Sequence, residues 1–298
     1  NHKKQLNGLL NLMMAGVTLV ALHGIFQYIT GAEMPPGWVD SAEAGVRTRA
    51  FSIAGNPNAL GGLMTLLIPL TVSHFLTARG KILKTLYAGY AGAMLLCLIF
   101  TFSRGAWFAF IGAMTLYSVM YMPLLLVAMT AGTAAAPFLV PGIVNRIAYL
   151  FSPAYMVSSA RAGRVARWEM ALDRVSNNPL TGDGFGRFGG AVADRYIQSS
   201  VYVDNFYLKT AAETGLVGIA VFAWLLLSGI RCATNAFRRV VGDNYLRGVV
   251  AGVTAGLVGI LLHNFVENIF EVPMLATYFW FLLGALAATP HLQKDHLH

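Results

Sequence analysis

The residues that could do chemistry gather in one polar stretch, 141–214, which holds seven arginines but only one lysine, Lys209. A guanidinium never deprotonates and pairs bidentately with phosphate through its planar fork, whereas an ammonium acts as a point charge. Among the carboxylates of this stretch, Asp204 precedes an apolar segment. These residue types favour a site that holds a phosphorylated substrate beside a base. The seven arginines are Arg146, Arg161, Arg164, Arg167, Arg174, Arg187 and Arg195.

Apolar segments flank this stretch on both sides and must position it. Of the 298 residues, 56% are hydrophobic and 11% are charged, a composition that excludes an ordinary soluble domain. A bilayer core of about 30 Å requires about 20 apolar residues per helix. The sequence therefore predicts an all-α polytopic membrane protein. Its expected transmembrane helices, about eight, are 6–29, 58–77, 85–102, 106–122, 124–140, 215–231, 247–263 and 273–289.

The spans divide the chain into three parts. Residues 1–140 hold five spans, residues 141–214 form an extracytoplasmic catalytic loop with amphipathic helices, and residues 215–298 hold three spans. The first apolar run is too long for a signal peptide and lacks a cleavage site of small residues. We interpret it as the first membrane helix of this sequence. A chain truncated at its N-terminus would begin in the same way.

The lysines and arginines predict the orientation in the membrane. Compact clusters at 2–4, 78–84 and 232–246 belong in the cytoplasm. Alternation then places the stretch 141–214 outside, together with the connections at 30–57, 103–105 and 263–271. The short outer connections hold Arg47, Arg49 and Arg104, where the positive-inside rule disfavours them. Phosphate recognition would explain their retention, and the alternative is that they contact lipid headgroups.

The net charge of +8 does not indicate nucleic acid, because the basic residues are spread over loops between apolar spans. Membrane lipids and a phosphorylated substrate are the expected partners. Cys97 and Cys232 lie in apolar runs and predict no disulfide. The glycine-rich run 182–190 has no strand before it, so it is not a dinucleotide-binding loop. No cofactor is expected.

Apolar and basic residues alternate at helical spacing over 159–175, with Trp168 on the apolar side and Arg164 and Arg167 on the adjacent stripe. This predicts an amphipathic helix that caps the bundle or lies on the membrane surface. A plain interfacial helix that binds lipid headgroups has the same pattern. Residues 177–179 should end this helix.

A second helix should begin after the dipeptide Asp204-Asn205 and continue into the membrane. Either residue could cap the helix, and Asp204 could instead be a catalytic base. Four residues separate Lys209 from Glu213, so these two are expected to pair.

The last outer segment places His263, Glu267 and Glu271 at spacings of four, on one face of a predicted helix. The spacing is not typical of a metal site, and a further ligand would be needed. We expect no metal here, and we expect these groups to pair with the outer arginines.

Five motifs together resemble the O-antigen ligase and polymerase family of bacterial surface-polysaccharide enzymes. In chain order they are AGNPNALGG, FTFSRGAWFAF, ARAGRVARWEMALDRVSNNPLTGDGFGRFGG, VDNFYLKTAAETGLVGIAVF and HNFVENIFEVPMLATYFWFLLGAL. In this family a many-helix scaffold carries a large periplasmic loop. The enzymes move glycan from an undecaprenyl-pyrophosphate carrier to an acceptor without nucleotide sugar or metal. The resemblance thus implies a bacterial cytoplasmic (inner) membrane protein with an extracytoplasmic active site.

The resemblance also assigns individual residues. The family's arginine in the Ser-Arg-Gly turn matches Arg104, and its arginine in the loop helix matches Arg164, with Arg161 as the near alternative. Ligases of lipopolysaccharide commonly have histidine where this chain has Asp204. This difference favours polymerisation, or ligation of another cell-wall glycan. Family members also commonly have about four more helices, so the chain is either truncated or naturally minimal.

The expected reaction needs charge neutralisation at the leaving phosphate and a base for the acceptor hydroxyl. We assign the first role to Arg104 and Arg164, and the second to Asp204, which neighbouring guanidiniums should keep ionised. Two alternative functions are a transporter of an anionic substrate and a non-catalytic scaffold in polysaccharide assembly. No span carries a mid-depth charge and no repeated halves are visible, which disfavours transport. The expected substrate-binding residues are Arg47, Arg49, Arg161, Arg167 and Asn205.

Overall fold

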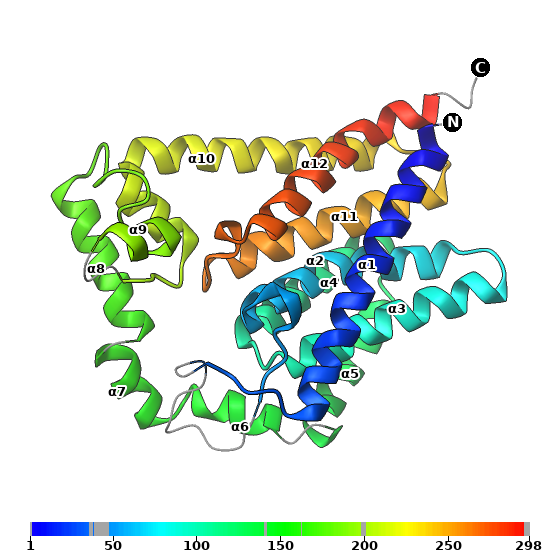
Figure 1. The fold of residues 1–298 in the computed structure, drawn as a ribbon. Helices are drawn as coiled ribbons and strands as arrows, with labels where there is room; N and C mark the ends of the chain where they lie inside the picture. The colour runs from blue at the N-terminus through cyan, green and yellow to red at the C-terminus, as the bar shows by residue number, and fades with distance from the viewer. Residues whose placement is uncertain are drawn as a thin grey trace.

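The chain folds into α-helices and connecting loops in a computed structural model that describes residues 2–35, 38, 48–139, 142–161, 163–197 and 201–294. No strand occurs in these residues, which confirms the all-α prediction. Figure 1 shows both termini at one end of a helical bundle, with the helices of the 141–214 insert at the opposite end.

Six helices of the described residues are long and apolar enough to cross a membrane. The eight predicted spans correspond to these six and to two further helices, α4 (Arg104–Tyr121) and α5 (Leu125–Leu139), of which α5 has only 15 residues. The count of eight is therefore not confirmed, whereas a multi-pass membrane protein is. The six helices are α1 (His2–Thr30), α2 (Pro57–Thr77), α3 (Lys81–Phe100), α10 (Phe206–Arg239), α11 (Asn244–His263) and α12 (Pro273–Lys294).

The centre of the bundle is the pair α2 and α11, whose side chains are mostly buried. Glycines on α11 allow this contact, because a Cβ at Gly256 would lie 2.1 Å from the carbonyl oxygen of Leu66 on α2. A Cβ at Gly61 on α2 would likewise lie 2.6 Å from Ala106 Cβ on α4. Small residues thus bring these helices together, as in other membrane bundles.

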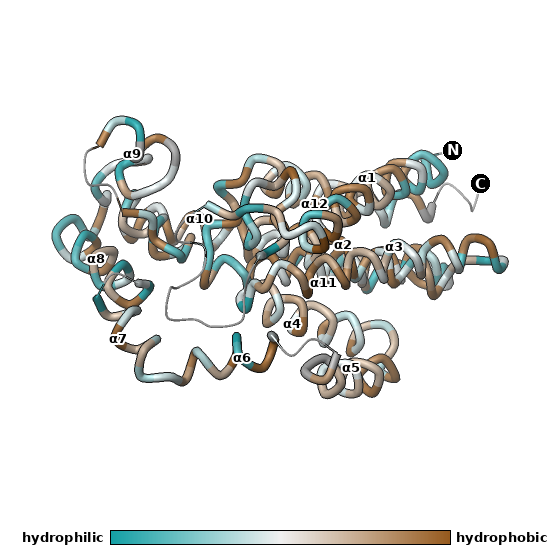
Figure 2. The backbone as a smooth tube through the Cα atoms, turned by 60° about the horizontal axis from the view of Figure 1, so that its bottom comes forward, coloured by the Kyte–Doolittle hydropathy of each residue, from teal (hydrophilic) through white to brown (hydrophobic). Residues whose placement is uncertain are grey.

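The insert forms four short helices: α6 (Gly142–Tyr149), α7 (Pro153–Arg161), α8 (Arg164–Asn177) and α9 (Gly190–Tyr196). The prediction of one helix over 159–175 was wrong at its start, since a bend at Gly163 separates α7 from α8. The predicted end at residues 177–179 is confirmed. Figure 2 shows that the residues of α8 and α9 are more hydrophilic than those of the helices in the bundle.

A bend in α10 joins the insert to the membrane helices. Gly215 has φ 65° and ψ −169° inside α10, a conformation that only glycine adopts readily. The backbone N–H groups of Leu216 and Val217 donate to the carbonyls of Pro179 and Leu180, at 2.7 and 3.4 Å. The insert backbone therefore accepts the hydrogen bonds that the bend releases from the helix.

Candidate functional site

A cavity of about 230 Å³ lies where the insert meets the end of the bundle. Four parts of the chain supply its walls: the loop before α2 with the first turn of α2, the start of α4, the helices α6 to α8, and the segment before α10. Five guanidiniums surround a single carboxylate in this cavity, which gives it an excess of positive charge suited to an anion. We call it the arginine pocket. Its charged lining residues are Arg49, Arg104, Arg146, Arg164, Arg167 and Asp204.

Asp204 is held between two arginines of α8. Its Oδ2 lies 3.2 Å from Arg167 Nη1 and 3.5 Å from Arg164 Nε, while Oδ1 forms no hydrogen bond to a described residue. Burial raises the pKa of this carboxyl above its ordinary value, and Arg164 and Arg167 oppose that rise. Sequence reasoning expected only the opposing effect of the arginines. A carboxylate with a raised pKa is a stronger base than an exposed one.

The cap of α10 is Asn205 and not Asp204. The side-chain oxygen of Asn205 accepts hydrogen bonds from the backbone N–H groups of Tyr207 and Leu208, both at 3.0 Å. The side chain of Asp204 is therefore not needed to begin the helix. Because the oxygen of Asn205 is engaged in capping, substrate binding by Asn205 stays a prediction that the geometry does not favour.

Arg164 and Arg167 occupy the first turn of α8, whose cap residue Gly163 has no side chain; Ser159 Oγ accepts from the backbone N–H of Val165 at 3.4 Å. Arg164 Nε is buried and, among the described residues, has an ionic contact with Asp204 but no hydrogen-bond partner. The start of a helix favours negative charge through its dipole and its free N–H groups. Both arginines are thus placed to bind an anion in the pocket.

Arg104 begins α4, directly after Ser103, whose hydroxyl oxygen caps the helix by accepting from the N–H of Ala106 at 3.4 Å. Its Nη1 donates to the carbonyl of Arg146 at 3.2 Å, and its guanidinium lies 5.4 Å from the ring centre of Tyr155. Stacking on an aromatic ring fixes the plane of a guanidinium. The Ser-Arg-Gly turn therefore directs Arg104 toward the insert.

Arg49 lines the pocket, but its guanidinium nitrogens donate hydrogen bonds to other residues of the protein. Its Nε donates to the carbonyl of Thr101 at 2.7 Å, its Nη1 to that of Trp38 at 2.8 Å, and its Nη2 to Asn58 Oδ1 at 3.0 Å. These bonds tie the first outer loop to the ends of α2 and α3. They favour a role in holding the pocket wall, and direct substrate binding by Arg49 stays a prediction.

Glu267 is a further acidic residue beside the pocket, and sequence reasoning gave it no catalytic role. Asn58 donates from Nδ2 to Glu267 Oε2, so Glu267 ends a chain of hydrogen bonds that starts at Arg49. Burial and the nearby charge of Asp204 together raise the pKa of Glu267 to about 7, although Arg164 opposes the rise. The segment that contains Glu267 also accepts from the backbone N–H of Phe206.

Arg146 is the second residue that sequence reasoning left without a role. It is buried in the pocket wall, and its Nε donates at 3.0 Å to the carbonyl of Phe102. Phe102 itself has φ 49°, a left-handed conformation that directs this carbonyl toward the insert. The only sequence signal was the excess of arginine over lysine, which could not separate Arg146 from its neighbours.

Two of the nominated arginines are not seen in the pocket. Arg161 ends α7 as an exposed residue and does not line the cavity, so of the two candidates for the family's loop-helix arginine only Arg164 lines it. Arg47 lies outside the described residues. The roles predicted for both stay predictions.

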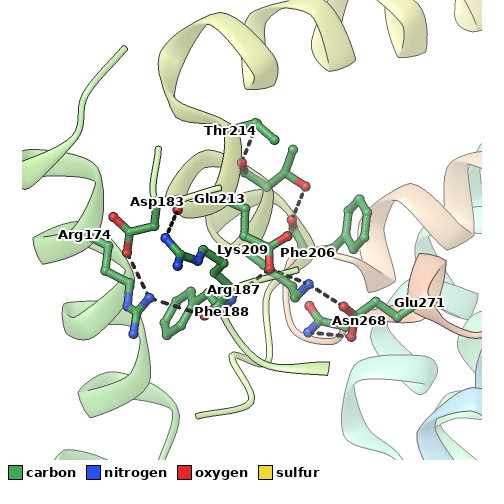
Figure 3. Close-up of polar contacts among 11 residues, drawn as sticks. Arg174, Asp183, Arg187, Phe188, Phe206, Lys209, Glu213, Thr214, Asn268 and Glu271 are labelled. Carbon is green, nitrogen blue, oxygen red and sulfur yellow. Dashed lines mark hydrogen bonds and ion pairs between the residues drawn. The ribbon is translucent and has the colours of Figure 1, made fainter. Parts of the chain in front are cut away.

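The expected helical face at 263–271 was wrong. α11 ends at His263, and a turn and a short 3-10 helix, Ile269–Glu271, follow. Glu271 does not pair with an arginine: its Oε1 lies 2.5 Å from Lys209 Nζ, which also lies 3.0 Å from Glu213 Oε1. The predicted pairing of Lys209 with Glu213 is confirmed. Figure 3 shows Lys209 between the two carboxylates.

This ion cluster holds the glycine-rich loop of the insert. Glu213 Oε1 also accepts the backbone N–H of Phe188 at 2.9 Å, and the carbonyl of Glu213 accepts the N–H of Gly184 at 3.0 Å. The cluster thus fixes the loop against the start of α10. Within the described residues, no three His, Cys, Asp or Glu side chains are grouped as a metal ion requires.

A family model described as O-antigen ligase matches residues 89–223. The matched range contains Arg104, Arg146, Arg164, Arg167 and Asp204, whereas Arg49 and Glu267 lie outside it. The family resemblance identified from the motifs is thereby confirmed over this part of the chain. A search of curated proteins found no significant match.

Proposed function

We propose, from the match of residues 89–223 to the O-antigen ligase family, that this protein is a membrane glycosyltransferase. It moves glycan from an undecaprenyl-pyrophosphate carrier to an acceptor on the outer face of the bacterial cytoplasmic membrane. The observation that carries the proposal is the arginine pocket, in which Asp204 lies within 3.5 Å of both Arg164 and Arg167. A base beside several guanidiniums is what transfer from a pyrophosphate requires.

The leaving group is the carrier pyrophosphate. The bond between the anomeric carbon and the β-phosphate oxygen breaks, and its electron pair remains on that oxygen. Arg104 and Arg164 neutralise the charge that develops there, with Arg167 beside them. Electrostatic stabilisation of this kind is commonly the largest single contribution to catalysis. Guanidiniums supply it without a metal ion, so transfer should persist in the presence of a chelator.

The acceptor hydroxyl attacks the anomeric carbon and loses its proton to Asp204. A new glycosidic bond forms, undecaprenyl pyrophosphate is released, and protonated Asp204 later returns its proton to solvent. One base is enough if the configuration at the anomeric carbon inverts, because no covalent glycosyl-enzyme is needed. The raised pKa of Asp204 supports this role, since it brings the basicity of the carboxylate closer to working pH.

The outer location rests on charge. The cationic clusters at 2–4 and 78–84 are on the side of the termini, and the insert is at the other end of the bundle (Figure 1). The positive-inside rule then favours an extracytoplasmic pocket. The acidic residue at position 204 favours a polymerase, or a ligase of a cell-wall glycan other than lipopolysaccharide.

The test is reconstitution of the purified chain in lipid vesicles with an undecaprenyl-pyrophosphate-linked oligosaccharide and a soluble glycan acceptor. We expect a glycan product of greater mass in the wild-type protein, and none in Arg164→Ala. Passage of labelled anion across the vesicle without a new glycosidic bond would indicate a transporter. Donor binding without product over all acceptors would indicate a scaffold, and either outcome would refute the proposal.

A further inference from the structure

A second polar cavity, of about 480 Å³, lies at the far end of α8 from the arginine pocket. We call it the outer recess. Figure 3 shows Arg174, Asp183 and Arg187 of its lining grouped beside the glycine-rich loop. It shares no lining residue with the arginine pocket. Its lining residues are Arg174, Asn178, Gly182, Asp183, Arg187 and Ile197.

The polar groups of the outer recess are held in fixed orientations. Asp183 accepts from Arg174 Nη1 and from Asn178 Nδ2, both at 2.9 Å, and its backbone carbonyl accepts from Arg187 Nη1 at 3.2 Å. The guanidinium of Arg174 also lies 4.4 Å from the ring centre of Phe188. These contacts use Nη1 of each arginine, which leaves Nε and Nη2 of both available to a ligand. Preorganised donors and acceptors of this kind bind with little ordering cost.

Exposed aromatic side chains lie next to these polar groups in the chain. Phe185, between the lining residues Asp183 and Arg187, is 89% exposed, and Tyr196, which precedes Ile197, is 74% exposed. An exposed aromatic ring is free to pack its face against the apolar face of a ligand. Fixed hydrogen-bonding groups beside an aromatic ring suit a sugar, which offers hydroxyl groups on its edge and C–H groups on its face. A phosphate alone would gain nothing from the rings and would be repelled by Asp183.

The two cavities lie along one face of α8. Arg167 of the arginine pocket and Arg174 of the outer recess are seven residues apart, which is two helical turns and about 10 Å along the axis. That span is comparable with the length of about two sugar units. A glycan that reacts in the arginine pocket and runs along α8 would therefore reach the outer recess with sugars beyond the reacting one.

We propose that the outer recess binds sugar units of the glycan substrate that lie about two units away from the reacting carbon. This inference rests on the proposed glycosyl transfer. Both the donor glycan and the acceptor glycan offer this chemistry, and the experiment separates them by changing the length of one at a time.

The test compares Phe185→Ala and Arg187→Ala with Phe151→Ala. Phe151 lies in the same insert and is 83% exposed, but it is far in the chain from the recess lining, whereas Phe185 lies between the lining residues Asp183 and Arg187, so Phe151 is a matched control. None of these three side chains is buried, so all three variants should fold. Transfer is measured with donors of one to four sugars and a fixed acceptor, and then with acceptors of increasing length and a fixed donor.

We expect KM for the longer glycans to rise about 10-fold in Arg187→Ala, the usual effect of losing a charge-assisted hydrogen bond. Phe185→Ala should act in the same direction, while KM for the shortest glycans and the behaviour of Phe151→Ala stay unchanged. If the rise in KM grows with donor length, the recess binds the donor glycan; if it grows with acceptor length, the recess binds the acceptor glycan. Equal effects on KM for short and long glycans, or no effect, would mean that these contacts only stabilise the insert, and would overturn the inference.

A failure of the proposed function would be seen separately. If the wild-type protein transfers no glycan, binding of a free oligosaccharide to the purified protein is measured by calorimetry. Binding that Phe185→Ala and Arg187→Ala weaken would support the recess without the reaction, and absent binding would refute it. If Phe185→Ala and Phe151→Ala both reduce the contact of the insert with lipid in reconstituted vesicles, the rings are membrane anchors, which also refutes it.

Discussion

Replacement of Asp204 by asparagine separates a catalytic base from a structural residue. Asparagine has nearly the same shape and keeps an oxygen that can accept from Arg167, but it cannot take a proton. The cap of α10 is unaffected, because Asn205 provides it. The change therefore removes the ionisable group and little else.

Loss of a catalytic base and loss of a structural ion pair differ enough in free energy to be told apart. The arginine side chains that pair with Asp204 keep 28% and 33% of their surface exposed, so the ion pairs contribute at most about 1 kcal/mol to stability. Loss of a general base lowers the rate about 10²-fold or more, which is about 2.7 kcal/mol in the activation free energy. We expect Asp204→Asn to fold and to bind donor, and to lose at least this factor in transfer.

The assay follows product formation from a lipid-linked donor in vesicles, with donor binding and thermal unfolding measured on the same preparations. Asp243→Asn is the matched control. Asp243 also pairs with a partly exposed cation, Lys3, with side-chain exposures of 21% and 25%, but it lies at the start of α11, at the end of the bundle away from the insert. It should reproduce any small loss of stability without the loss of rate.

Wild-type turnover in Asp204→Asn would refute the role of Asp204 as a base. Attention would then move to Glu267, whose carboxyl lies beside the same pocket. A loss of rate accompanied by an equal loss of donor binding would also count against the base, because it would place Asp204 among the binding groups.

Three further predictions follow from the same geometry. Arg164→Lys should weaken donor binding about 10-fold or more, because lysine cannot pair bidentately with phosphate; full binding in a titration with donor would favour contact with lipid headgroups instead. The transfer rate should fall as pH falls through the raised pKa of Asp204, because only the ionised carboxylate accepts a proton. Finally, a single cysteine at Tyr196 should react with an impermeant reagent in intact cells and one at Lys81 should not, in a background free of accessible cysteine; the reverse pattern would invert the topology.

Local sequence signals predicted the parts of the site that depend on local structure. The helical stripe around Arg164 and Arg167, the turn before Arg104 and the position of Asp204 were all visible from spacing, and these residues meet in one cavity. Hydrophobic length also predicted the membrane helices, although α5 at 15 residues is shorter than a span requires.

Long-range pairing was not visible in the sequence. Asn58 and Glu267 are hydrogen-bonded although they lie 209 residues apart, and only the packing of α2 against α11 brings them together. Spacing suggested instead that Glu267 shares a helical face with Glu271, because four-residue spacing predicts a helix wherever the backbone continues as one. The turn after His263 breaks that assumption. Burial, which decides the pKa of Asp204, likewise depends on neighbours that a single sequence does not identify.

The bend at Gly215 has a consequence for genetics. A Cβ there would lie 2.3 Å from the backbone of Leu180, and the φ of +65° would be strained for any L-residue. Every single-nucleotide missense change of a glycine codon adds a Cβ, so none can be accommodated without separating the insert from α10. In a saturation screen, this codon should therefore tolerate synonymous changes alone. Val217, an exposed position two residues along, should accept most apolar replacements.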